Sequence, residues 1–163
     1  MTHDTEPTMR PDTLAVHAGN APDESTGAVA PPLHLSTTFR HGPAGERVAG
    51  YEYQREGNPT NDRLREALAA LEGGATACTF ASGMAATGAI MSMLKSGDHV
   101  VVSDNVYGGT FRLFDKVLSR YQLTFTYVDT GDLDATRRAF TPATRLLFVE
   151  TPSNPVMRIT DLA

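Results

Sequence analysis

The stretch "GDHVVVSDNVYGG", residues 97–109, decides the fold of this chain. Its consecutive valines, 100–102, show no alternation of apolar and polar side chains, which is typical of a strand buried on both faces. Polar residues 103–105 end this strand, and the glycines after Tyr107 lead into a stretch with helical character. A buried strand followed at once by a helix indicates one unit of an α/β fold.

Apolar runs and helical stretches alternate on both sides of this unit. We predict strands at 75–81, 99–104, 123–129 and 144–150, and helices at 83–95, 107–121, 132–140 and from about Thr160 onward. Such an alternation predicts a parallel, doubly wound sheet. The expected fold class is therefore α/β.

A different pattern precedes these units. Leucines recur at helical spacing within 61–74, which predicts a helix capped by Thr60 or Asn61. Proline and glycine interrupt residues 1–58 repeatedly, so we expect an extended arm with few regular elements there. The predicted organisation is an N-terminal arm, 1–58, followed by a folded domain, 59–163.

The composition excludes several classes of function. The chain has 163 residues, of which 40% are hydrophobic and 20% are charged, and its net charge is −5. This acidic balance argues against a nucleic-acid surface, and no apolar run approaches the roughly 18 residues of a membrane span. The single cysteine, Cys78, cannot form an internal disulfide, and the histidines show no metal-ligand spacing; His99 is expected to be structural. We expect a cytoplasmic protein without a signal peptide, a membrane partner or a metal site.

Small and polar residues follow the predicted strands at the sheet edge where open α/β folds bind ligands. Ser82, Gly83 and Met84 join a strand to a helix, so the backbone N–H groups of Gly83 and Met84 are predicted to face an anion. The alternative is a plain strand–helix turn in which glycine serves only tight packing. No glycine-rich dinucleotide or P-loop fingerprint surrounds this turn, which disfavours a nucleotide-binding domain.

Other polar side chains suit parts of a phosphorylated aromatic ligand. Tyr53 and Arg55 could bind a phosphate, although a solvated loop explains them equally well. Tyr107 could lie flat on a planar ring, or it could only pack against its neighbours. Arg112 could bind a carboxylate, and Asn154 could orient a ring hydroxyl or only form a turn.

Six segments in one order closely resemble the trans-sulfuration (Cys/Met metabolism) family of pyridoxal-phosphate enzymes, in its cystathionine γ-synthase and γ-lyase branch. These segments are "YEYQREGNPT", "LEGG", "FASGMAA", "GDHVV", "VYGGTFRLF" and "VETPSNP". The resemblance implies a fold-type I large domain, a parallel-rich sheet sandwiched by helices, here incomplete and preceded by an extended arm. It also implies a homotetramer, with the arm as an inter-subunit clasp and each site shared across a dimer.

The resemblance assigns roles to residues of this chain. It implies that Gly83 and Met84 donate to the phosphate of pyridoxal 5′-phosphate and that Tyr107, also a catalytic residue, stacks on its ring. It places Asn154 at the ring hydroxyl. Tyr53 and Arg55 are implied to reach the phosphate in the neighbouring subunit. It implies contacts with the distal end of the amino-acid substrate through Glu52 and Arg112.

The implied reaction is γ-elimination or γ-replacement on cystathionine-type or O-acyl-homoserine-type amino acids. Methionine γ-lyases of the family carry a cysteine where this chain has Gly109, which disfavours that activity. Methionine γ-lyase and O-acetylhomoserine sulfhydrylase activities are the alternatives. The family's Schiff-base lysine and its ring-nitrogen carboxylate match no position here, and neither Lys95 nor Lys116 replaces the lysine. We therefore expect an N-terminal fragment that is inactive alone. The alternative from another class is an inert fragment that only binds cofactor phosphate or a partner subunit.

Overall fold

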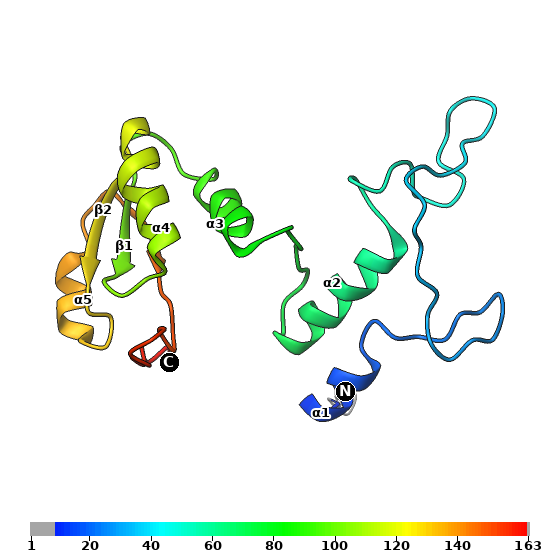
Figure 1. Ribbon diagram of the computed structural model, residues 1–163, viewed down its shortest axis with the longest axis horizontal. Helices are drawn as coiled ribbons and strands as arrows, with labels where there is room; N and C mark the ends of the chain where they lie inside the picture. The colour runs from blue at the N-terminus through cyan, green and yellow to red at the C-terminus, as the bar shows by residue number, and fades with distance from the viewer. Residues whose placement is uncertain (1–8, 163) are drawn as a thin grey trace, which may run out of the picture. The chain divides into compact units, whose positions relative to one another are not determined.

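The computed structural model describes residues 9–162, which form two compact units that divide between Thr79 and Phe80 (Figure 1). The first unit contains the helices α1 (Pro11–His17) and α2 (Pro59–Leu71). Because α2 belongs to the same compact unit as the segment before it, the division lies after this helix. The organisation with an arm at 1–58 stays a prediction.

The start of α2 corrects the predicted cap. Asn58 is the N-cap residue, and its side chain accepts a hydrogen bond from the Thr60 N–H at 2.9 Å, so neither Thr60 nor Asn61 is the cap. Pro59 explains the difference, since proline is favoured at the first helical position and places the cap one residue earlier. Asn58 also donates to the His34 carbonyl oxygen at 3.0 Å, which ties the preceding segment to α2.

The segment before α2 has few regular elements, as predicted, but it contains the short helix α1, which the prediction missed. No residue of α1 is buried, and its 7 residues are too few to show a helical repeat of apolar side chains. Further along, backbone hydrogen bonds from Phe39 to Glu52 (3.0 Å) and from Gln54 to Thr37 (2.9 Å) pair two short extended segments. This pairing fixes the loop that carries Tyr53.

The second unit is built around a parallel sheet of strand order β2-β1-β3, which confirms the predicted parallel topology. Its elements in chain order are α3 (Gly83–Met91), β1 (His99–Ser103), α4 (Gly108–Arg112), the π-helix η1 (Leu113–Val117), the 3-10 helix η2 (Leu118–Tyr121), β2 (Thr124–Val128), α5 (Leu133–Ala139) and β3 (Thr144–Phe148). Figure 1 shows α4 and its continuation running alongside the sheet.

One face of the sheet packs beneath the helix that follows β1. Val100 and Val102 of β1 are fully buried, and their register partners on β2 and β3 present aromatic or leucine side chains to the same face. Phe114 of η1 stacks on Phe125 with a ring-centroid distance of 4.8 Å and meets Phe148 edge-on at 5.4 Å. These contacts form the core of the second unit.

The opposite face of the sheet is polar near the N-terminal ends of its strands. The ring of His99 is held by Thr144 Oγ1 at 2.7 Å and by Thr126 Oγ1 at 2.9 Å, which confirms its structural role across three strands. All of β1 is buried, as its valines predicted. On β3, half-buried and exposed residues alternate and Leu147 is 40% exposed, so this strand is not buried on both faces as β1 is.

Two further predicted elements are absent from residues 9–162. Residues 75–81 form no strand, because none of the described segments offers them a hydrogen-bonded ladder; Cys78 within this stretch is exposed. Residues 156–162 form no helix either. The backbone N–H of Thr160 instead donates a hydrogen bond to the side-chain oxygen Thr151 Oγ1 at 3.0 Å.

The Tyr127 hydroxyl is buried and has no hydrogen-bond partner among residues 9–162. Tyr127→Phe is expected to raise the free energy of unfolding by about 1 kcal/mol, because it removes an unsatisfied buried polar group. Burial, followed by the charge of Asp115, raises the pKa of Tyr127 above its ordinary value of 10.0. The folded state disfavours ionised Tyr127, so the free energy of unfolding falls as pH rises above 10.0 and through the raised pKa. Urea unfolding at pH 7 and above pH 10 should show a larger fall in the unchanged chain than in the variant.

Candidate functional site

The N-terminus of α3 presents two free backbone donors. Ser82 is the N-cap, and its hydroxyl oxygen accepts the Ala85 N–H at 3.1 Å while its carbonyl accepts the Ala86 N–H at 3.1 Å. Within residues 9–162, no hydrogen bond engages the N–H groups of Gly83 and Met84. Two unengaged donors at the positive end of a helix favour a bound anion.

The space around Gly83 is open on the side where a side chain would begin. A Cβ atom added to Gly83 would meet no atom within 4 Å. A ligand can therefore reach the backbone here without displacing protein atoms, which is the situation in which glycine serves close approach.

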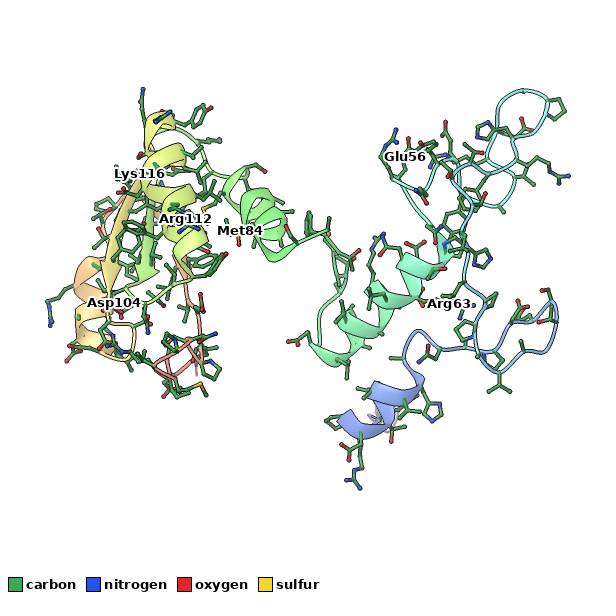
Figure 2. All side chains as sticks on the ribbon, in the orientation of Figure 1. Glu56, Arg63, Met84, Asp104, Arg112 and Lys116 are labelled. Atoms are coloured by element: carbon green, nitrogen blue, oxygen red, sulfur yellow. The ribbon has the colours of Figure 1, made fainter. Side chains whose placement is uncertain are left out.

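These donors lie at the wall of a hollow of about 530 Å³ within the second unit. Its lining comes from the start of α3, the start of α4 and the end of β3: Ser82, Gly83, Met84, Thr87, Tyr107, Thr110, Phe148, Val149 and Glu150. Figure 2 labels Met84, whose sulfur accepts a hydrogen bond from the Thr110 hydroxyl at 3.8 Å. The size and the mixed apolar and polar lining suit a small organic molecule.

Tyr107 lines this hollow, and a hydrogen bond from its backbone fixes its position. Its N–H donates to Glu150 Oε2 at 2.8 Å, and its side chain is 59% exposed. The ring lies against Gly109, because a Cβ there would overlap Tyr107 Cε1 and lie 2.9 Å from Cδ1. An aromatic ring that is exposed and anchored in this way can stack on a planar ligand.

Gly109→Ala is expected to move the Tyr107 ring while the fold remains. Because Tyr107 is exposed and alanine favours helix over glycine by about 0.5–1 kcal/mol, the free energy of unfolding should stay within about 1 kcal/mol. The ring resonances of Tyr107, observed by NMR with labelled tyrosine, should shift clearly. Gly108→Ala is the matched control, since a Cβ there would come only within 3.3 Å of the flexible Arg112 Nη1. Equal shifts in both variants would contradict the prediction.

Glu150 lines the hollow, although the sequence did not single it out as a site residue. Its backbone N–H donates to Ser103 Oγ at 3.3 Å, so it is positioned from the end of β1 as well as from Tyr107. Its place at the C-terminal end of the strand predicted at 144–150 was the available signal, because open sheets bind ligands at that edge.

Asn154 does not line the hollow that holds Gly83, Met84 and Tyr107. Its side chain is exposed and makes no hydrogen bond within the described part of the chain. It lies five residues beyond Val149, in a turn that follows β3.

Tyr53 and Arg55 lie together in the first unit. Arg55 Nη1 donates to the Tyr53 hydroxyl at 2.8 Å, and the Arg55 Cζ atom lies 4.1 Å from the centre of the Tyr53 ring. Arg55 is exposed, so the pair presents a cation and a hydroxyl on one surface. This combination can bind a phosphate.

Glu52 lines a separate hollow of about 380 Å³ in the first unit. Arg47 holds its carboxylate, with Nε at 3.0 Å and Nη2 at 2.7 Å from Glu52 Oε2, and also reaches Glu56 Oε2 at 2.6 Å. The pKa of Arg47 is raised, chiefly by its hydrogen bond to Glu52. Tyr51 donates to Asp62 in the same hollow, and burial raises the pKa of Tyr51 above its ordinary value.

Arg112 is exposed at the end of α4, on the helix that begins directly after Tyr107 (Figure 2).

None of the residues that line the hollow of the second unit is a lysine, and Lys116 instead pairs with Asp115 at 2.5 Å. Within residues 9–162, no three His, Cys, Asp or Glu side chains gather in a way that would hold a metal ion. None of the described helices has the length and apolar character needed to cross a membrane.

The donors and the ring of this site fit a phosphorylated aromatic cofactor such as pyridoxal phosphate. The unengaged N–H groups of Gly83 and Met84 suit the phosphate, and the open space at Gly83 admits it. The exposed ring of Tyr107 on the same hollow suits a planar heterocycle.

Comparison with known proteins agrees with this chemistry. A family model described as "Cys/Met metabolism PLP-dependent enzyme" matches residues 12–163. The chain is 52% identical over 153 residues to cystathionine gamma-synthase of Mycobacterium tuberculosis, covering 93% of this chain and 39% of the relative. It is 44% identical over 154 residues to cystathionine gamma-lyase of Bacillus subtilis, covering 94% and 40%.

A solved structure is similar over the same part of the chain. The crystal structure of metB from Corynebacterium glutamicum matches with a TM-score of 0.90 and 42% identity, over 94% of this chain and 40% of that chain. The chain therefore spans about 40% of the length of the relatives that it matches.

Proposed function

Because the chain belongs to the family of Cys/Met metabolism PLP-dependent enzymes, we propose that it forms part of the pyridoxal-phosphate site of a trans-sulfuration enzyme. The family membership confirms the resemblance seen in the sequence motifs. The proposed reaction is γ-elimination or γ-replacement on cystathionine-type or O-acyl-homoserine-type amino acids. Relatives named cystathionine gamma-synthase and cystathionine gamma-lyase support this reaction class.

A single observation carries the proposal. Gly83 and Met84, with free N–H groups, share one hollow with the exposed ring of Tyr107. Phosphate donors and a stacking ring are the two contacts that fix the orientation of pyridoxal phosphate. When bound, this cofactor supplies an electron sink that stabilises carbanions formed from amino acids.

We assign the following roles to residues of the second unit. Gly83 and Met84 bind the phosphate, and Tyr107 stacks on the ring and holds its plane. Glu150 holds the Tyr107 backbone through its 2.8 Å hydrogen bond. We also assign Asn154 to the ring hydroxyl and Arg112 to the distal end of the substrate, as the resemblance implies, although neither residue lines the hollow.

The residues of the first unit act in a second copy of the chain. Tyr53 and Arg55 form a phosphate clamp for the neighbouring subunit, and the preceding segment forms an inter-subunit clasp. The exposed apolar side chains of Val29 (82%), Leu33 (76%) and Leu35 (88%) support a partner on this segment. Glu52, oriented by Arg47, contacts the substrate.

Gly109 supports the γ-synthase or γ-lyase branch over methionine γ-lyase. The Tyr107 ring occupies the volume that a side chain at position 109 would need. A side chain at position 109 would require the Tyr107 ring to move.

The proposed location is the cytoplasm, because a chain with one cysteine, Cys78, suits a reducing compartment.

The proposal is tested by equilibrium binding of pyridoxal phosphate and of pyridoxal, which lacks the phosphate, to the full chain. Pyridoxal phosphate should bind at least about tenfold more tightly, because hydrogen bonds to a charged group contribute about 1.5–3 kcal/mol. Inorganic phosphate should compete with it. Equal affinities for the two compounds would show that the N-terminus of α3 binds no phosphate and would refute the proposal.

A further inference from the structure

The carboxylate of Glu150 carries a negative charge into the hollow of the second unit. None of the residues that line this hollow is a lysine, an arginine or a histidine. Among residues 9–162, no ion pair engages the Glu150 carboxylate. The protein therefore leaves this charge unbalanced, in a hollow that also presents the free N–H groups of Gly83 and Met84.

Two hydrogen bonds fix Glu150 and leave one of its carboxylate oxygens available. Its backbone N–H donates to Ser103 Oγ at 3.3 Å, and Ser103 is itself only 4% exposed. Its Oε2 atom accepts the backbone N–H of Tyr107 at 2.8 Å. Its Oε1 atom accepts no hydrogen bond within the described part of the chain. Oε1 is thus an acceptor that is already held in place, so that little conformational entropy is lost when a ligand binds to it.

The two features of the hollow favour opposite charges on its occupant. The N-terminus of α3 favours an anion. The unpaired carboxylate of Glu150 repels anions, and it accepts hydrogen bonds most strongly from a charged donor. A phosphate alone would satisfy the helix and leave the carboxylate unpaired, whereas a molecule with both a phosphate and a cationic amino group would satisfy both.

We propose that Glu150 is a ligand-binding residue, whose Oε1 atom accepts a hydrogen bond from an amino group of the molecule bound in the hollow. This inference rests on the proposed function and names one further contact of that site. Within the proposed reaction class, the amino-acid substrate supplies the amino group. If Glu150 served only to hold the Tyr107 backbone, a neutral acceptor would serve equally well, so the charge of Glu150 distinguishes the two roles.

Two phosphate esters that differ in a single group test this inference on the full chain. Pyridoxamine phosphate carries a cationic aminomethyl group where 4-deoxypyridoxine phosphate carries a methyl group. Isothermal titration at neutral pH should show that the unchanged chain binds pyridoxamine phosphate at least about fivefold more tightly, because the donor and the acceptor are both charged. Glu150→Gln, which keeps an acceptor for the Tyr107 N–H but loses the charge, should reduce the ratio of the two affinities to about one.

Asp134→Asn is the matched control, since it also removes one carboxylate from the second unit. Asp134 is 76% exposed, pairs with Arg137 at 3.1 Å and does not line the hollow. This variant should keep the preference for pyridoxamine phosphate within about twofold, because solvent screens exposed charges. Circular dichroism of each variant verifies that the fold is retained.

The outcomes separate this inference from the proposed function. A preference that survives Glu150→Gln, an equal loss in Asp134→Asn, or no preference in the unchanged chain would overturn the inference alone. Equal affinities of the unchanged chain for 4-deoxypyridoxine phosphate and for 4-deoxypyridoxine, which lacks the phosphate, would instead refute the proposed function.

Discussion

Gly83→Pro is expected to weaken pyridoxal-phosphate binding about tenfold or more, because it removes one of the two free phosphate donors. A hydrogen bond from an N–H to a charged group contributes about 1.5–3 kcal/mol, and a tenfold change corresponds to about 1.4 kcal/mol. Gly83 is the first residue of α3, where proline is tolerated, and Ser82 has φ −160° and ψ 160°, the extended conformation that precedes proline. The helix should therefore form as before.

Gly83→Ala is the matched control for this prediction. Alanine keeps the backbone N–H, and its Cβ would meet no protein atom within 4 Å. Fluorescence titration of pyridoxal phosphate should give the alanine variant an affinity close to that of the unchanged chain. Similar losses in both variants would mean that bulk at position 83, and not the donor, controls binding.

Phe114→Ala is expected to lower the free energy of unfolding by about 3–5 kcal/mol. Phe114 is fully buried and contacts β2 through Phe125 and β3 through Phe148, so its removal leaves a cavity between η1 and two strands. Small domains have total stabilities of about 5–15 kcal/mol, so this loss would leave the second unit marginally stable. Urea unfolding followed by circular dichroism measures the change.

Phe111→Ala serves as the comparison for Phe114. Phe111 is 41% exposed and lies 5.4 Å from the Tyr127 ring, so its loss should cost about 1 kcal/mol. A comparable loss for both variants would contradict the location of the core beneath η1.

The strands near the middle of the chain could be predicted because their signal is local. The consecutive valines of β1 predicted burial on both faces from their own sequence, and the polar residues after them mark its end. Residues 75–81 have equally apolar character but form no strand in the described structure, since a strand also requires a neighbour. The cap of α2 was misplaced for a local reason, because Pro59 makes Asn58 the N-cap.

The candidate site was predictable where one short segment supplies the chemistry. The turn at Ser82 and Gly83 predicts free N–H groups from its sequence alone, because every helix start leaves such donors. Glu150 was missed because its contact with the Tyr107 N–H joins residues 43 positions apart. The contacts of Arg158 likewise run to carboxylates that follow two other strands, at Asp104 and Asp129.

The amino-acid sequence by itself determined the α/β class, the positions along the chain of the segments that form the parallel strands, and the family. Each of these follows from local apolar patterns and short motifs. Only the tertiary structure decided which of these segments share a hollow and which polar groups become buried partners. The physical reason is that hydrogen bonds and cavities between distant residues depend on strand order and register. Sheet order β2-β1-β3 brings the end of β3 beside that of β1, and this places Glu150 at Tyr107 and Arg158 at Asp104.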